Sequence, residues 1–159
     1  DILNRYFSKQ VAVLFRHQGT LDKFIGDAIM AVWGAPVDDP DHAKHAVAAA
    51  LEMADTLLAF REELGEVGLN FDVGIGVHSG PAVVGLIGSD ARREYTAIGD
   101  TVNLASRIEG LTKGVARILV SEDTRRMCGD AFEFIDRGAF KVKGRAQDVR
   151  LYEPKRKTT

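Results

Sequence analysis

The sequence has few of the features that would assign it to a specialised class of protein. Its 159 residues include one cysteine, Cys128, so no internal disulfide can form and nothing indicates an oxidising compartment. The formal net charge is −2, without the basic excess of nucleic-acid binders. No apolar run reaches the roughly 18 residues needed to cross a bilayer, and no signal-peptide pattern is seen. We therefore expect a cytoplasmic location, including the cytoplasmic part of a membrane-attached protein, with no nucleic-acid partner and no membrane contact from this segment.

What the sequence does contain is typical of one globular domain. Apolar residues make up 45% and charged residues 28% of the chain, which is ordinary for a folded core. Asp1 already stands at the start of a helical pattern, so we expect the printed sequence to begin inside a larger protein. We assign residues 1–153 to one domain and residues 154–159 to a basic, solvated tail.

Hydrophobic spacing predicts alternating strands and helices, which favours a layered α/β (α+β) fold. Two apolar strands flank Gly26-Asp27, a strong hairpin signal, and a second hairpin is predicted around residues 79–81. Three residues are predicted to cap helices: Asp41, Asp100 and Ser121. Helices are predicted at 1–18, 41–64, 99–111 and after residue 121. Strands are predicted at 21–25, 28–33, 71–77, 82–87, 95–98, 117–120, 132–136 and 149–152.

The tip of the first hairpin carries a carboxylate, Asp27, that could coordinate a hard cation through oxygen. Aspartate also follows glycine in tight turns for backbone reasons alone, so the motif by itself leaves both interpretations open. Lys23 lies four residues earlier on an apolar strand, where its ammonium group could equally extend to solvent. Strand alternation predicts that Asp22 points away from the side of Asp27.

The helix predicted at 99–111 presents Asn103 and Arg107 on one face, because they are four residues apart. An amide and a guanidinium on one rigid surface suit a phosphate or ribose oxygen, although a solvated polar face is the simpler alternative. Lys143 and Arg145 flank Gly144 in a loop that could meet a polyphosphate or form an ordinary turn.

Other clusters carry weaker signals. Asp39 and its acidic neighbours, with His42 and His45, could bind a transition metal, but acidic residues at a helix start more often cap it. The glycine-rich segment 74–88 lacks a dinucleotide or P-loop spacing, so its glycines more simply allow another backbone to approach. Ser79 follows His78 without an identifiable acid, so a hydrolase triad is unsupported.

Taken together, four segments resemble the catalytic domain of class III adenylate and guanylate cyclases, particularly the bacterial adenylate cyclases. The run 19–36, which contains Lys23-Phe-Ile-Gly-Asp27, resembles their metal-binding hairpin. Residues 76–85 resemble the central hairpin, and residues 94–109 resemble the most specific signature of the family. Val142-Lys-Gly144 resembles the C-terminal phosphate-binding loop. The four motifs occur in order across nearly the whole chain.

The resemblance implies a ferredoxin-like βαββαβ core that works as a head-to-tail homodimer with active sites at the interface. Asp27 matches one of two aspartates that bind Mg²⁺ or Mn²⁺, with two ions per site. Asn103 and Arg107 match residues that orient the ribose and stabilise the transition state, and Lys143 matches a lysine that contacts the terminal phosphates. Metal ligands come from one chain and the other groups from its partner. A regulatory domain upstream is also expected.

Lys23 and Thr96 match the pair that recognises the purine. A lysine can donate to an adenine ring nitrogen, and a threonine hydroxyl can accept from the exocyclic amine, whereas guanine presents a different edge. Guanylate-forming relatives typically place Glu at the position of Lys23 and Cys or Ser at that of Thr96. We therefore expect ATP to be converted to 3′,5′-cyclic AMP and pyrophosphate by two-metal catalysis, with some use of GTP.

One family motif is missing from the printed sequence, namely an earlier strand with an Asp-Ile-x-Gly-Phe-Thr-like run that supplies the first metal aspartate. We expect the printed polypeptide alone to have little cyclase activity, and an N-terminally extended version to have more. Two alternatives remain open: a catalytically inactive cyclase homology domain that dimerises or senses nucleotides, and a guanylate cyclase. The Gly-Gly-Asp-Glu-Phe-type hairpin of diguanylate cyclases is not seen.

Overall fold

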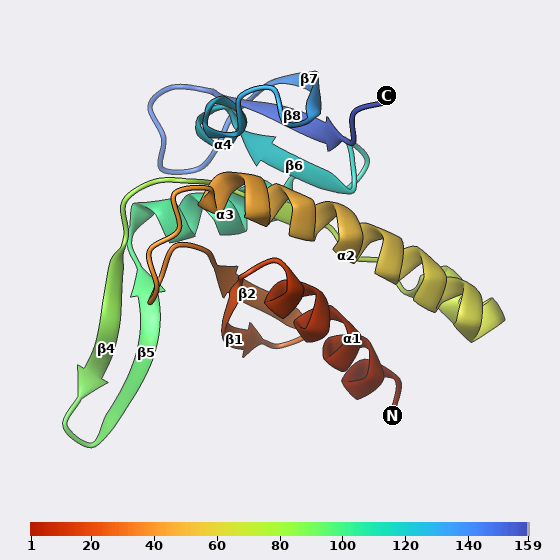
Figure 1. Ribbon diagram of the computed structural model, residues 1–159, viewed down its shortest axis with the longest axis horizontal. Helices are drawn as coiled ribbons and strands as arrows, with labels where there is room; N and C mark the ends of the chain where they lie inside the picture. The colour runs from red at the N-terminus through yellow and green to blue at the C-terminus, as the bar shows by residue number, and fades with distance from the viewer. Residues whose placement is uncertain (159) are drawn as a thin grey trace.

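The computed structural model, which describes residues 1–158, alternates helices and strands as predicted (Figure 1). In chain order the elements are α1 Ile2–Arg16, β1 Thr20–Ile25, β2 Ala28–Val32, α2 His42–Leu64, a 3₁₀ helix Gly65–Asn70, β3 Ile75–Val77, β4 Val83–Ser89, β5 Arg92–Ile98, α3 Asp100–Gly110, β6 Ile118–Ser121, α4 Glu122–Cys128, β7 Glu133–Phe140 and β8 Val149–Lys155. Across residues 1–158, no helix combines the length and the apolar character needed to cross a membrane.

A four-stranded mixed sheet in the order β3-β6-β8-β7 forms the centre of the fold. All four residues of β6 are buried, which is expected of a strand covered on both faces. Ile118 and Val120 pack with α2 and α4, whereas Leu119 between them packs with Leu104 and Ile108 of α3. The alternation of side chains along β6 therefore fixes α3 on one face of the sheet and α2 with α4 on the other.

A separate β1–β2 hairpin and α1 lie on the far side of α2 from this sheet (Figure 1). Tyr6 of α1 and Phe60 of α2 are almost fully buried, and both rings contact Phe71 in the segment before β3. The tight turn at Gly26-Asp27 is confirmed, because Ile25 pairs with Ala28 directly across it. Within residues 1–158, β2 pairs only with β1, and β3 only with β6.

The second predicted hairpin is wrong. β3 is only three residues long and pairs in parallel with β6, while β4 pairs in antiparallel fashion with β5. The chain turns at residues 90–91 instead of 79–81, and the β4–β5 hairpin extends from the body as an arm (Figure 1). Local turn signals could not show that the partner of residues 75–77 lies more than forty residues later in the sequence.

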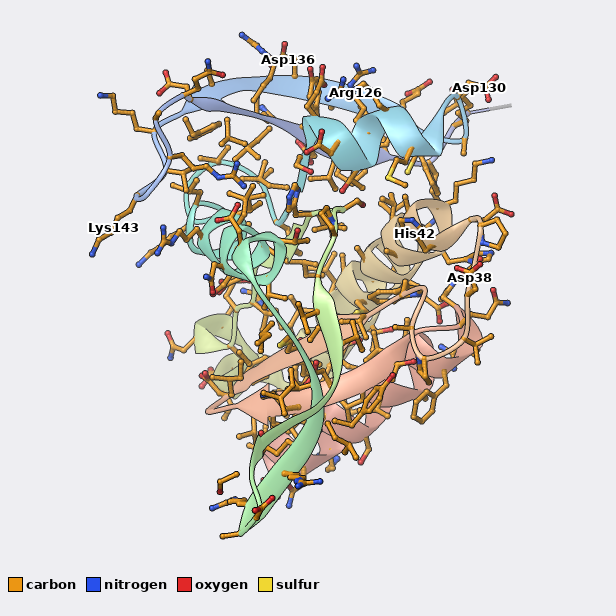
Figure 2. All side chains as sticks on the ribbon, turned by 90° about the vertical axis from the view of Figure 1, so that its left-hand side faces the viewer. Asp38, His42, Arg126, Asp130, Asp136 and Lys143 are labelled. Atoms are coloured by element: carbon orange, nitrogen blue, oxygen red, sulfur yellow. The ribbon has the colours of Figure 1, made fainter. Side chains whose placement is uncertain are left out.

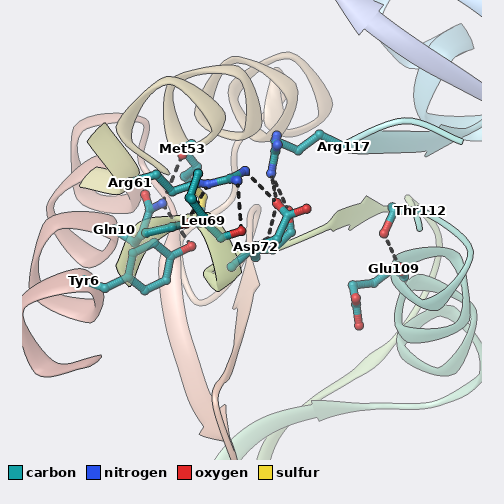
Figure 3. Close-up of polar contacts among 11 residues, drawn as sticks. Tyr6, Gln10, Met53, Arg61, Leu69, Asp72, Glu109, Thr112 and Arg117 are labelled. Carbon is teal, nitrogen blue, oxygen red and sulfur yellow. Dashed lines mark hydrogen bonds and ion pairs between the residues drawn. The ribbon is translucent and has the colours of Figure 1, made fainter. Parts of the chain in front are cut away.

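Asp72 holds the segment that leads into β3, as Figure 3 shows. Its carboxylate forms an ion pair with Arg117 next to β6, and a longer one of 3.5 Å with Arg61 of α2. Arg117 lowers the pKa of Asp72 by hydrogen bonding to the charged carboxylate. These ion pairs join α2, the segment before β3 and the segment before β6, which are distant in sequence. They do so at the start of β3, the strand on which α3 packs.

The helix starts agree only partly with the predicted caps. The Ser121 hydroxyl accepts from the Thr124 backbone N–H and caps α4 as predicted. Asp41 stands at the N-cap of α2 but its side chain makes no capping bond, and Gly99 rather than Asp100 is the N-cap of α3. At the other end of the chain, Pro154 is buried within β8, which continues to Lys155, so the solvated tail does not begin at Pro154.

Candidate functional site

Two candidate residues, Lys23 and Thr96, lie together where β1 passes β5. The Lys23 ammonium is 3.5 Å from a carboxylate oxygen of Glu94 on β5, two residues before Thr96. Thr96 itself is 5% exposed, and its hydroxyl donates to the carboxylate of Asp22, the residue before Lys23. The hydrogen-bonding groups predicted to recognise a purine are therefore neighbours within one chain.

Asp22 was not among the predicted site residues, and the structure brings it into this group. The register of β1 against β2 shifts between Leu21 and Lys23, so Asp22 has no partner on β2 and forms a β-bulge. A bulge breaks strand alternation, and here Asp22 and Lys23 both reach β5. Regular strand alternation could not predict this shared side, and within residues 1–158 no hydrogen bond or ion pair joins Asp22 to Asp27; a carboxylate in an otherwise apolar strand was the available signal.

A second group forms between α3 and the loop after β7. The guanidinium of Arg107 donates to the backbone carbonyl oxygen of Lys143, thirty-six residues later. Gly144, at φ +86°, lets the loop approach so closely that a Cβ there would lie 2.9 Å from the same Arg107 nitrogen. Asn103 is exposed on the same face of α3 as Arg107, one turn nearer the helix start. The guanidinium thus contacts the Lys143 loop directly, and the Asn103 amide lies on the same helix face.

Further charged groups surround the start of α3. Arg145 forms an ion pair of 3.0 Å with Asp100, which fixes the other side of the Gly144 turn. His78, at the end of β3, is hydrogen-bonded through Nδ1 to the Ser121 hydroxyl at 2.7 Å. Burial lowers the pKa of His78. Burial thus favours the neutral imidazole over the charged form in this group beside the start of α3.

Asp27 stands apart from these two groups. It occupies the exposed tip of the β1–β2 hairpin, where Gly26 takes φ +61°, and among residues 1–158 no hydrogen bond or ion pair joins it to another candidate residue. The described residues contain no group of three His, Cys, Asp or Glu side chains suited to a metal ion. Asp27 offers one carboxylate, so the described residues of a single chain do not fit a complete two-metal site.

The acidic segment before α2 is a helix start rather than a site. Asp39 accepts from the Asp41 backbone N–H at 3.0 Å and from His45 Nδ1 at 2.6 Å. The hydrogen bond from His45 lowers the pKa of Asp39. Figure 2 shows Asp38 and His42 at the opposite edge of the molecule from Lys143. These bonds occupy Asp39 and His45 at the turn before α2, although the Asp41 side chain does not make the predicted capping bond.

The two groups on one chain are connected by backbone. β5, which carries Thr96, runs through Gly99 directly into α3, which carries Asn103 and Arg107. The candidate residues on β5 and on α3 thus lie on consecutive elements of the chain. Over residues 1–153 the sequence matches the family described as the adenylate and guanylate cyclase catalytic domain.

The chain belongs to this family. It is 41% identical over 154 residues to adenylate cyclase 1 of Rhizobium meliloti, and 39% identical over 163 residues to an adenylate cyclase of Anabaena cylindrica. Each alignment covers 96% of the chain but only 23% and 31% of the relative, so the chain spans less than a third of these curated relatives. This cyclase domain therefore corresponds to one part of much longer proteins.

The fold is also that of solved cyclases. The crystal structure of the adenylyl cyclase CyaB from P. aeruginosa superimposes with a TM-score of 0.91 at 31% identity, covering 99% of this chain and 82% of that one. The guanylyl cyclase Cya2 superimposes with a TM-score of 0.87 at 36% identity, covering 96% and 78%. The predicted cyclase fold is confirmed. Because both activities occur on this fold, the choice of nucleotide depends on side chains.

Proposed function

We propose that this domain is an adenylate cyclase, which converts ATP to 3′,5′-cyclic AMP and pyrophosphate at the interface of a homodimer. The observation that carries the proposal is the neighbouring placement of Lys23 and Thr96 on β1 and β5. The Lys23 ammonium donates to an adenine ring nitrogen, and the Thr96 oxygen accepts from the exocyclic amine. The sequence similarity to two adenylate cyclases supports the same choice.

In this proposal the second group binds the sugar and the phosphates. Asn103 orients the ribose, Lys143 contacts the terminal phosphates, and Arg107 stabilises the charge that develops on the α-phosphate. Arg107 suits this role because a guanidinium presents several N–H donors in a fixed plane, of which one is used on the Lys143 carbonyl oxygen.

Divalent metal ions are part of the chemistry of this family. We propose that Asp27 supplies one carboxylate ligand for Mg²⁺ or Mn²⁺. Since Asp27 lies apart from Lys143 and Arg107 in one chain, the proposed dimer places the hairpin tip of one copy beside the nucleotide held by the other. A single copy would then hold an incomplete site.

The β4–β5 arm is the proposed dimer contact. Its exposed apolar side chains include Val83, Leu86, Tyr95 and Ile98, which are 64%, 68%, 45% and 45% exposed. Apolar side chains gathered on a projecting element favour burial against a second protein surface. In the homodimer that surface belongs to the other copy.

Replacement of Leu86 by arginine is expected to weaken this dimer at least about tenfold, because a charge would enter an apolar contact. Sedimentation velocity over a concentration series measures the change, and cyclase activity should fall in parallel at low concentration. Leu69→Arg, at a 73% exposed leucine outside the arm, is the matched control and should leave the dimer unchanged. Equal dimerisation of both variants would contradict the proposed interface.

The activity is tested by supplying equimolar ATP and GTP with Mg²⁺ or Mn²⁺ to the full encoded protein and quantifying both cyclic products. Cyclic AMP in excess over cyclic GMP is expected. An excess of cyclic GMP would favour the guanylate cyclase alternative. Binding of ATP without any cyclic product would favour an inactive dimerisation or nucleotide-sensing module.

A further inference from the structure

Asp22 is a carboxylate with an unusual position in β1. Its side chain is 2% exposed, although the strand around it is only half-buried. The β-bulge at Asp22 turns this carboxylate toward β5, where it meets the threonine of the proposed purine-recognition pair. Burial of a carboxylate is costly unless its oxygens find donors, so the donors that Asp22 has found are informative.

Both carboxylate oxygens of Asp22 accept hydrogen bonds from β5. The Thr96 hydroxyl lies 2.8 Å from Oδ1 and 3.0 Å from Oδ2, and the Ala97 backbone N–H donates to Oδ2 at 3.0 Å. The Lys23 ammonium, 3.9 Å from Oδ1, provides nearby positive charge. An ionised carboxylate has acceptor sites only, so the Thr96 hydroxyl must be the donor in this contact.

The single hydrogen of the Thr96 hydroxyl is therefore committed to Asp22. The other acceptor within reach, the Ala97 carbonyl oxygen, is 3.4 Å away, and the hydroxyl would be the donor there as well. Because Thr96 is almost fully buried, water cannot readily replace these partners. What the Thr96 oxygen can still offer to a ligand is a lone pair.

We propose that Asp22 is a positioning residue that sets nucleotide specificity by fixing the Thr96 hydroxyl as a hydrogen-bond acceptor. The inference rests on the proposed function, in which Thr96 faces the six-position of the purine. An acceptor there pairs with the exocyclic amine of adenine and repels the carbonyl oxygen of guanine. A threonine alone can donate or accept, so the discrimination comes from the carboxylate behind it.

Asp22→Asn is expected to reverse the polarity of Thr96. The Ala97 N–H still needs an acceptor, so the new amide oxygen takes the place of Oδ2 and the amide nitrogen that of Oδ1. That nitrogen donates to the Thr96 oxygen, whose own hydrogen becomes free to donate to a carbonyl. The ratio of kcat/KM for ATP to that for GTP should fall about tenfold to a hundredfold, mostly through improved use of GTP.

The experiment measures this ratio in the full encoded protein for the unchanged sequence and for Asp22→Asn. Asp130→Asn is the matched control, since it makes the same chemical change at an exposed side chain in the turn after α4, outside β1, β5 and the β4–β5 arm. It should leave the ratio unchanged. A purely structural role for Asp22 would lower kcat/KM for ATP and GTP by the same factor, and that result would overturn the proposal.

A double-mutant cycle adds a readout that tests whether Asp22 acts through Thr96. In a Thr96→Val background the hydroxyl is absent, so Asp22→Asn should leave the ATP-to-GTP ratio within about twofold. A further tenfold change in that background would show that Asp22 affects specificity by another route and would overturn the proposal.

A measurement on the unchanged protein covers the case in which Asp22→Asn does not fold. Purine riboside 5′-triphosphate keeps the ring nitrogens of ATP but lacks the six-amino group, so its kcat/KM should be at least about tenfold lower than that of ATP. Equal use of both nucleotides would overturn the proposal. Absence of cyclic AMP from the unchanged protein would instead contradict the proposed function itself, and the inference with it.

Discussion

Arg107→Lys is expected to lower kcat for cyclic AMP formation about a hundredfold or more, with KM for ATP changing much less. The physical reason is geometric. Lysine keeps the positive charge, but it cannot hold the Lys143 carbonyl oxygen with one N–H and present others in the same plane to the α-phosphate. Steady-state kinetics at saturating and limiting ATP separate the two parameters.

The control for charge and chemistry is Arg126→Lys. Arg126 is an exposed arginine of α4 that pairs with Asp123 at 2.9 Å, and Figure 2 shows it well away from Lys143. Its replacement should leave kcat within about twofold of the unchanged protein, because a surface ion pair of this kind contributes little. If Arg107→Lys raised KM and left kcat unchanged, Arg107 would bind the ground state rather than the transition state, contrary to the proposal.

The parts of the fold that could be predicted from the sequence are those set by local patterns. The turn at Gly26-Asp27 was predicted because a two-residue Gly-Asp loop between apolar strands is typical of a hairpin. Asn103 and Arg107 were expected on one face because they are four residues apart on a helix. The loop at Lys143-Gly144 was also predicted from a local pattern, and Gly144 takes φ +86° there.

The parts that could not be predicted depend on contacts between distant residues. The short strand β3 lacks a turn signal for its true partner, and the bulge at Asp22 is visible only once β1 is paired with β2. The N-cap of α3 was assigned to Asp100, but α3 begins at Asp100 and Gly99, at φ +127°, takes the capping position before it. In each case tertiary geometry, rather than propensity, decided the outcome.

Gly76 shows how this geometry supports the proposed site. It lies in β3, directly beneath α3, and a Cβ at this position would stand 2.4 Å from the Glu109 backbone nitrogen and 2.8 Å from the Ala105 carbonyl oxygen. Both atoms belong to the backbone of α3, so no side chain can move aside to make room. The expectation that a glycine here permits close backbone approach is confirmed.

Gly76→Ala is therefore expected to push α3 away from the sheet. Overpacking of this kind costs about 1–3 kcal/mol, which for a domain of this size lowers Tm by roughly 2–12 °C in thermal unfolding. Activity should fall further than stability, because α3 carries Asn103 and Arg107 and a displacement of about 1 Å can reduce turnover a hundredfold. Circular dichroism and the cyclase assay at a temperature well below Tm separate the two effects.

Gly110→Ala provides the comparison on the same helix. A Cβ there would meet no atom within 4 Å, and alanine is the better helix former, so stability should be unchanged or slightly higher and activity retained. The contrast between the two substitutions isolates the β3–α3 spacing as the cause. Equal Tm and equal turnover for both variants would mean that α3 can move from β3 without cost, and that the position of Arg107 does not depend on its packing against the sheet.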